Sequence, residues 1–401
     1  MSQGEQVIRP LSGIRVVELS SSLAGPYLGM CLGDMGADVI KVENPSGGDM
    51  TRQWSPQEIG GEAAYFLSAN RNKRSVALDL QAAQGQRLLR QMVRQSDIVI
   101  DNFRPDSALH QELSYDFLRA DNERLIMVHI SAFGEVGPWR GRPGYDLVAQ
   151  ASAGLMSVTG EPDGPPVRAG YSIADLSAGM FGLVGVLAAL FERNRTGKGR
   201  YVTTSLFEAQ LALHVNLAMN MFADAGTPAP LGSAHPNLAP YQAFRANDGH
   251  FVIAAGSDRL YQRLCNAIGR ADLGVDDRFR TNADRVANRE ELVQLIEAVL
   301  VDRSVDEWCT VLDDHGVPNA PILDLARVYG HPHTQALNMV RSVNHVQGPL
   351  PQVFSPISLD GHRLTPGLAP PTLGQHTREV LTEIGVDSDS LAALFAAGTI
   401  V

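Results

Sequence analysis

Hydrophobic and polar positions alternate in short blocks through the first half of the chain, and these blocks predict strands and helices in turn. Short apolar runs predict strands over 14–19, 37–43, 76–80, 98–100, 125–131 and 201–206. Residues with apolar positions at helical spacing predict helices that end near Met35 and that cover 81–95 and 207–222. Strands that alternate with helices predict an α/β fold with a parallel sheet.

The stretch from Leu176 to Phe191 carries no charge and has apolar residues at helical spacing. Glycine recurs there at every third position, which predicts a buried helix with one face open to close packing. Asp175 precedes this run and should stand where the helix begins. A carboxylate there meets unpaired backbone N–H groups and the positive end of the helix dipole, so we expect it to be ionised. It would serve as a helix cap and also as a nucleophile.

The second half has a different pattern. An Ala-, Gly- and Pro-rich segment over 223–240 predicts a linker. Apolar runs on both sides of Asn247-Asp248-Gly249 predict a β-hairpin over 242–245 and 249–254. Helices are predicted over 258–268, 289–300, 305–315, 323–329 and 377–384, with a proline-rich, strand-poor tail from 348 onward.

Composition limits the partners and the compartment. The 401 residues carry a net charge of −11, which argues against nucleic acid and anionic membranes as partners. Three widely separated cysteines suggest neither a metal site nor disulfides, as in a reducing compartment. The polar N-terminus does not resemble a signal peptide, and the uncharged run is shorter than a bilayer requires. We expect a soluble, cytoplasmic protein.

Two polar and basic clusters, 70–75 and 101–105, lie next to predicted strands. Both suit a charged ligand, although either could be a solvated turn. The loop over 134–145 adds Arg140 and Arg142, and the loop over 44–49 follows a strand at the edge where open parallel sheets usually bind ligands.

Other site types fit less well. The chain lacks the Gly-x-Gly-x-x-Gly pattern of dinucleotide sites after its first strand. Gly170–Ala174 comes close to the Gly-x-Ser-x-Gly elbow of serine hydrolases, but the predicted helix starts too late. His331 and His333 have no suitable third metal ligand nearby. An ionised carboxylate that attacks an acyl group, together with basic groups for phosphates, points instead to acyl-CoA chemistry.

Eight motifs in order carry a resemblance to a known family. They are Leu11–Val16, Gly36–Glu43, Asn70–Ser75, Asn102–Pro105, Gly144–Asp146 and Ile173–Asp175, with Thr196–Gly199 and Leu373–Thr377 closer to the C-terminus. The chain resembles class III CoA-transferases, the family of formyl-CoA transferase and crotonobetainyl-CoA:carnitine CoA-transferase. The likeness extends over nearly the whole chain.

The resemblance implies a Rossmann-like large domain built from both chain ends, here 1–222 and 335–401. It implies a small α+β domain over 241–334 that includes the return linker, with 223–240 as the first linker. Two chains of this family interlock, so a homodimer is implied. No metal and no permanently bound cofactor is expected, because CoA and acyl-CoA are substrates.

The resemblance also implies the site residues. Asp175 stands at the catalytic aspartate, which forms an aspartyl–acyl anhydride and then an aspartyl–CoA thioester. The CoA contacts fall at Leu23, Ala24, Asn44, Leu78, Asp79, Gln81, Asn102, Phe103, Arg104, Arg142, Gly144 and Tyr145. The segment Ala254–Ser257 has one glycine where formyl-CoA transferase has a run of them, which disfavours the formate–oxalate pair.

Different reactions on the same fold stay open. The α-methylacyl-CoA racemases use a His and Asp pair, and Tyr145 occupies the place of that His, which disfavours racemisation. A thioesterase acting through Ser172 and a non-catalytic acyl-CoA binder are two further candidate functions. The acceptor is expected to be a carboxylic acid, and a dicarboxylate such as succinate or malate is plausible.

Overall fold

The computed structural model describes residues 8–54, 56–104, 106–365 and 367–401. Its contacts divide the chain into two compact units. The first unit contains residues 1–155, 169–219 and 333–401, so both chain ends belong to it. The second contains residues 156–168 and 220–332.

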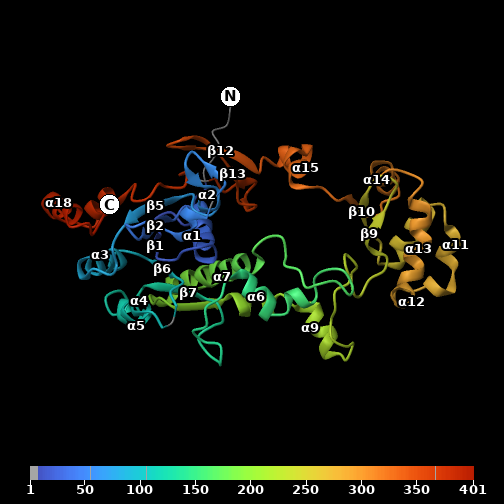
Figure 1. Cartoon of the computed structure of the whole chain (residues 1–401), viewed down its shortest axis with the longest axis horizontal. Helices are drawn as coiled ribbons and strands as arrows, with labels where there is room; N and C mark the ends of the chain where they lie inside the picture. Colours follow the sequence, from blue (N-terminus) through green and yellow to red (C-terminus); the bar gives the residue numbers. More distant parts are fainter. Residues whose placement is uncertain (1–7, 55, 105, 366) are drawn as a thin grey trace. The chain divides into compact units, whose positions relative to one another are not determined.

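A six-stranded parallel sheet forms the centre of the first unit (Figure 1). Its strand order is β5-β2-β1-β6-β7-β8. The strands are β1 (Arg15–Glu18), β2 (Asp38–Glu43), β5 (Lys73–Ala77), β6 (Ile98–Asp101), β7 (Ile126–Ser131) and β8 (Tyr201–Ser205). The sheet confirms the predicted α/β class.

Helices cover both faces of this sheet because alternate strand residues point to opposite sides. Val16 packs with α1 (Ala24–Asp34) and α7 (Ile173–Thr196) in one core. Val17, the next residue, packs with α3 (Ala83–Arg94) and the C-terminal α17 (Thr377–Glu383) and α18 (Ser388–Ala396) in the other. Segments near the two ends of the chain therefore share one core, in which α18 lies near α3 (Figure 1).

Helix α7 differs from its prediction. It has 24 residues and begins at Ile173, two residues before Asp175. By length and composition the whole helix could cross a membrane, whereas its uncharged run, Leu176–Phe191, is shorter than a bilayer requires. Its buried residues, such as Ala178 and Val186, instead pack against α1 and the sheet as a core helix does.

Shorter elements complete the first unit. They are η1 (Met50–Gln53), β3 (Glu58–Ile59), β4 (Glu62–Ala63), α2 (Ala64–Ser68), α4 (Ala108–Glu112), α5 (Tyr115–Arg119), α6 (Asp146–Ser152) and α8 (Leu206–Ala212). Two elements, η2 (Leu155–Ser157) and α9 (Val215–Phe222), begin in the first unit and end in the second. The helix predicted over 207–222 is thus two helices, which are separated at Leu213 and His214. The tail from 348 onward, predicted to be strand-poor, contains β13 (Gly348–Val353), β14 (Ser358–Leu359) and β15 (His362–Arg363). Strand β13 forms a hairpin with β12 (Val340–His345), which precedes the tail.

The second unit has its own core beneath an antiparallel sheet. The predicted hairpin is confirmed as β9 (Tyr241–Arg245) and β10 (His250–Ala254), with β11 (Asn319–Pro321) added beside β10. Its helices are α10 (Asp258–Ala267), α11 (Ala271–Val275), η3 (Asp277–Phe279), α12 (Asn282–Ala287), α13 (Arg289–Leu300), α14 (Val305–Asp314) and α15 (Leu325–Gly330). Helix α16 spans Pro332–Leu337.

Candidate active site

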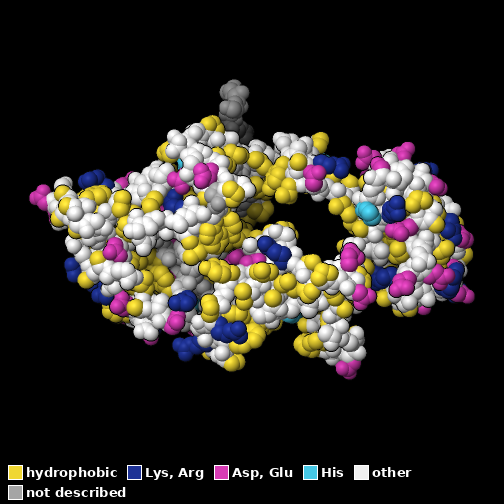
Figure 2. All heavy atoms as spheres, in the orientation of Figure 1, with side chains coloured by type: hydrophobic (Ala, Val, Ile, Leu, Met, Phe, Trp, Pro, Cys, Tyr) yellow, Lys and Arg dark blue, Asp and Glu magenta, His cyan; other side chains and the backbone are white. Residues whose placement is uncertain are grey.

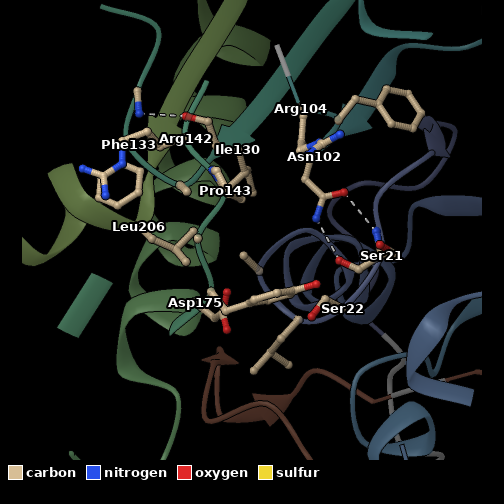
Figure 3. A pocket seen from close by; sticks show the side chains of 18 of the residues that line it. Ser21, Ser22, Asn102, Arg104, Ile130, Phe133, Arg142, Pro143, Asp175 and Leu206 are labelled. Atoms are coloured by element: carbon tan, nitrogen blue, oxygen red, sulfur yellow. Dashed lines mark hydrogen bonds between the residues drawn. The ribbon is translucent and has the colours of Figure 1, made fainter. Parts of the chain in front are cut away.

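A cavity of about 420 Å³ opens at the carboxyl edge of the parallel sheet. Asp175 from the start of α7 lines it, together with the loop after β1, the tip after β6 and the loop after β7. Figure 3 shows Asp175 facing this space across from Ser22, with Asn102 and Arg104 at another side. Among the described residues that line it, Asp175 is the one carboxylate, and Arg104 and Arg142 are the cations.

A second cavity of about 200 Å³ lies next to the first. Ser21 and Phe103 line both cavities. The first contains the predicted residues Asp175, Leu23, Ala24, Asn102, Phe103, Arg104, Arg142, Gly144 and Tyr145. The second contains Asn44, Leu78, Asp79 and Gln81, again with Phe103. All of the predicted site residues, which come from widely spaced segments, therefore meet in two adjoining cavities.

Asp175 is not the helix cap that the sequence predicts. It is the third residue of α7, and its side chain caps nothing. Asp146, at the start of α6, caps α7 instead: its Oδ1 accepts from the backbone N–H of Ala174 at 2.9 Å and of Asp175 at 3.5 Å. Its Oδ2 accepts from Gln150 at 2.6 Å. The Asp175 carboxylate is thereby left free to face the cavity.

The electrostatics of Asp175 also differ from the prediction. Burial raises the pKa of the Asp175 carboxyl to about 7, and the nearby negative charge of Asp146 contributes to the rise. The expected effect of the helix N-terminus, which would keep the group firmly ionised, is outweighed. A carboxyl pKa that is raised this far by burial and by a neighbouring charge is typical of functional sites.

The two arginines of the first cavity are available to an anionic ligand. Arg104 is largely exposed, and its Nε lies 3.8 Å from the Oδ1 of Asp106 in a long ion pair. The guanidinium of Arg142 lies 5.2 Å from the ring of Trp139 and 5.7 Å from that of Phe133. Such stacking holds the guanidinium plane without neutralising its charge. Pro105, which ends the predicted tip, lies outside the described residues.

The other predicted basic cluster, Asn70–Ser75, is not a ligand site. Its residues are buried, and Lys73, Arg74 and Ser75 form the start of β5. Arg71 pairs with Asp34, Lys73 with Glu18 and Arg74 with Asp38. These carboxylates are more than thirty residues away in sequence, so the charge run alone could not reveal that they neutralise it.

The geometry gives no support to a serine hydrolase or to a histidine metal site. Ser172 precedes the first residue of α7 and lines neither cavity. His331 and His333 are exposed and belong to no group of potential metal ligands among the described residues. Sequence reasoning missed Ser21, Ser22, Phe133 and Asp146 as site residues. The motif Gly144-Tyr145-Asp146 was the available signal for Asp146.

The comparisons with known proteins decide the family. The model of CoA-transferase family III matches residues 11–377. The chain belongs to this family. It is 39% identical to "Succinate--glutarate CoA-transferase" of Agrobacterium fabrum over 382 residues, which covers 94% of this chain and 96% of the relative. It is 35% identical to "Succinyl-CoA:glutarate CoA-transferase" of Mus musculus, with coverage of 98% and 91%.

Solved structures of family members agree with this assignment. A CAIB/BAIF family protein from Brucella suis matches with a TM-score of 0.83 and 39% identity, over 94% of this chain and 100% of that one. Rv3272 from Mycobacterium tuberculosis matches with a TM-score of 0.83 and 31% identity, over 94% and 100%. The protein is thus a family III CoA-transferase, an enzyme whose substrates are CoA thioesters, and the resemblance seen in the sequence is confirmed.

Proposed function

We propose that this enzyme moves CoA from a dicarboxylic acyl-CoA, such as succinyl-CoA, to a second dicarboxylic acid, with Asp175 as the nucleophile. The observation that carries the proposal is the position of Asp175 as the single carboxylate among the described residues of a cavity that also holds two arginines. Relatives named for succinate, glutarate, D-citramalate and mesaconate support the substrate class.

CoA would extend across both cavities. Its thioester must reach Asp175 in the first cavity, where Arg104 and Arg142 offer positive charge for phosphates. The second cavity is unsuited to phosphates, because Glu43, Asp49 and Asp79 line it and Lys41, the cation among its described residues, is paired with Glu18 and Asp49. An uncharged part of the adenosine moiety fits there better. Asn44, Leu78 and Gln81 would contact it.

The reaction would proceed by nucleophilic catalysis in four steps. A carboxylate oxygen of Asp175 attacks the thioester carbonyl, CoA thiolate leaves, and an aspartyl–acyl anhydride forms. The thiolate then attacks the aspartyl carbonyl and releases the donor acid, which gives an aspartyl–CoA thioester. The acceptor carboxylate displaces the thiolate to form a second anhydride. Attack of the thiolate on the acceptor's acyl carbon releases the new acyl-CoA and restores Asp175.

The raised pKa of Asp175 suits this sequence of steps. The group must attack as a carboxylate and later depart as one, so a pKa close to the working pH balances the two demands. Burial supplies the shift and also keeps water from the anhydrides, which hydrolyse readily.

The enzyme would act as an interlocked homodimer in the cytoplasm. An interface between two copies is supported by large apolar side chains that stay exposed on α6, α7 and α8, including Leu147, Met180, Val184, Phe191 and Leu211. Figure 2 shows hydrophobic side chains along the face that carries α6. Exposed apolar patches of this kind mark interfaces. The domain bounds proposed are 1–222 with 335–401, and 241–334. We propose no permanently bound cofactor, nucleic acid or membrane partner.

A panel of CoA donors and acids tests the substrate class. Succinyl-CoA should transfer its CoA to glutarate and to other four- to six-carbon dicarboxylates, and formyl-CoA with oxalate should be poor. A clear preference for monocarboxylic acceptors would contradict the proposal. Exposed Tyr145, at the position of the racemase His, lines the cavity but offers no ready base, so racemisation is the weaker candidate.

A further inference from the structure

The loop from Ser20 to Leu23 joins β1 to α1 and forms one wall of the site. Ser21, Ser22 and Leu23 line the cavity that contains Asp175. The start of α1, directly after the loop, is also in close backbone contact with α7. One helical turn after Asp175, a Cβ atom on Gly179 would stand only 2.7 Å from the carbonyl oxygen of Ala24. The position of this loop therefore contributes to what faces the Asp175 carboxylate.

Side chains from three other segments hold the backbone of this loop. Lys41 Nζ donates to the carbonyl of Ser20 at 2.8 Å. Asn102 bonds Ser21 twice: its Oδ1 accepts from the N–H at 3.1 Å and its Nδ2 donates to the carbonyl at 2.8 Å (Figure 3). Asp49 Oδ1 accepts from the N–H of Ser22 at 3.2 Å. Three consecutive residues of the loop thus have backbone groups bound by side chains.

The loop conformation requires such support. Ser22 has φ +75°, in the left-handed region that residues other than glycine rarely adopt. A serine stays there only when its surroundings hold it. The hydrogen bonds to Ser20 and Ser21 supply part of that constraint, and Asp49 binds the N–H of Ser22 itself.

Two of the three supporting side chains are charges removed from water. Lys41 is 1% exposed and pairs with Asp49 at 2.8 Å and with Glu18 at 2.9 Å. Glu18 also pairs with Lys73 at 2.9 Å. The four groups form a balanced cluster of two cations and two anions. Apolar residues can often replace a buried ion pair without loss of stability. The hydrogen bonds from Lys41 and Asp49 to the loop backbone give this cluster a positional role.

We infer that Lys41 and Asp49 are positioning residues of CoA transfer, which hold the Ser20–Leu23 loop in the conformation that Asp175 chemistry requires. This inference rests on the proposed role of Asp175. Neither residue lines the cavity that contains Asp175. Both line the second cavity, so the same pair borders one part of the bound CoA and fixes the wall that faces the other.

The test compares Asp49→Ala with Asp34→Ala as a matched control. Both aspartates are 3% exposed, and each pairs with a buried cation, but Asp34 binds Arg71 and lines neither cavity. We expect Asp49→Ala to lower kcat at least tenfold while KM for acyl-CoA changes less than threefold. Asp34→Ala should leave kcat within about twofold. Asp49→Asn keeps an oxygen for Ser22 N–H and should retain at least a third of kcat.

If Asp49→Ala does not fold, the double variant Lys41→Met/Asp49→Ala serves instead, because it preserves charge balance and the Glu18–Lys73 pair. It should show the same loss of kcat without a change in KM. Equal losses in the Asp49 and Asp34 variants, or a change confined to KM, would overturn the inference. Failure of the Asp175 proposal is distinguishable: the wild-type enzyme would then form no covalent adduct at Asp175, whatever the loop variants do.

Discussion

The carboxylate of Asp146 lies at the N-terminus of the helix that carries Asp175 and accepts the backbone N–H of Ala174 at 2.9 Å. One side chain thus performs two tasks. It satisfies helix donors that Asp175 would otherwise bind, and its negative charge adds to burial in raising the pKa of Asp175 to about 7. The proposed nucleophile and the residue that caps its helix are thus separate residues, twenty-nine positions apart.

Neutralising that cap should move the pH dependence of the reaction. In the proposed mechanism Asp175 attacks in its ionised form, so kcat/KM should fall on the acid side of a pKa near 7. In Asp146→Asn the amide oxygen still accepts the Ala174 N–H, but the negative charge is gone, so the acid limb should shift to lower pH. A pH profile of kcat/KM measures this. An unchanged or upward-shifted limb would show that Asp146 does not act on Asp175 through its charge.

Asp175→Asn should abolish transfer and stabilise the fold. The folded-state pKa is raised above its usual value, so the folded protein binds this proton more tightly than the unfolded chain. Stability from this group is therefore full below about pH 4 and is lost as pH rises through about 7. The asparagine variant has no carboxyl to ionise at this position, so its stability does not fall with pH for this reason. We expect its Tm to exceed that of wild type by roughly 2–5 °C at pH 8 and to match it near pH 4. A Tm at pH 8 below that of wild type would contradict the claim that ionising this buried carboxyl destabilises the folded protein.

Gly179→Ala should damage the site through packing alone. The added Cβ would lie 2.7 Å from the Ala24 carbonyl, which is backbone and cannot rotate away. Overpacking of this kind costs about 1–3 kcal/mol and shifts backbone, here in the wall facing Asp175. We expect kcat to fall at least tenfold. Gly182→Ala, in the same helix, meets only side-chain atoms at 3.2 Å or more and should retain most activity. Similar activity in both variants would argue against a critical α1–α7 contact.

The sequence pattern predicts the sheet and the site edge well because both depend on local signals. Apolar runs such as Ile98–Ile100 predict strands independently of their surroundings, and loops after parallel strands gather at one edge. The family resemblance adds the individual residues expected to contact CoA, and the structure brings all of them to that edge. What the pattern misses depends on partners distant in sequence. Arg74 looks like a ligand-binding residue until Asp38 and Glu383 are seen beside it.

The role of Asp175 shows the same limit within the site itself. The sequence predicts that Asp175 lies near the start of a helix and that it is a candidate nucleophile. The sequence does not predict its raised pKa, because burial and the proximity of Asp146 arise only from tertiary packing. A rule for carboxylates at helix N-termini predicts the opposite direction.

The enzyme should not racemise its substrates. Racemisation removes the α-proton of an acyl-CoA and requires a base on each side of that carbon, but Tyr145 stands where one base would be. We expect no deuterium at C2 of 2-methylacyl-CoA after incubation in deuterated water, as followed by mass spectrometry. Steady incorporation that disappears in Asp175→Ala would favour the isomerase reaction instead.

Covalent capture at Asp175 tests the central claim most directly. The enzyme is incubated with succinyl-CoA without an acceptor, treated with hydroxylamine, digested and mapped by mass spectrometry. Hydroxylamine attacks anhydrides and thioesters, so Asp175 should become a hydroxamate in the peptide spanning Ala169 to Arg193, and Ser172 should stay unmodified. A label on Ser172, or complete absence of label while transfer to glutarate proceeds, would contradict the aspartyl mechanism.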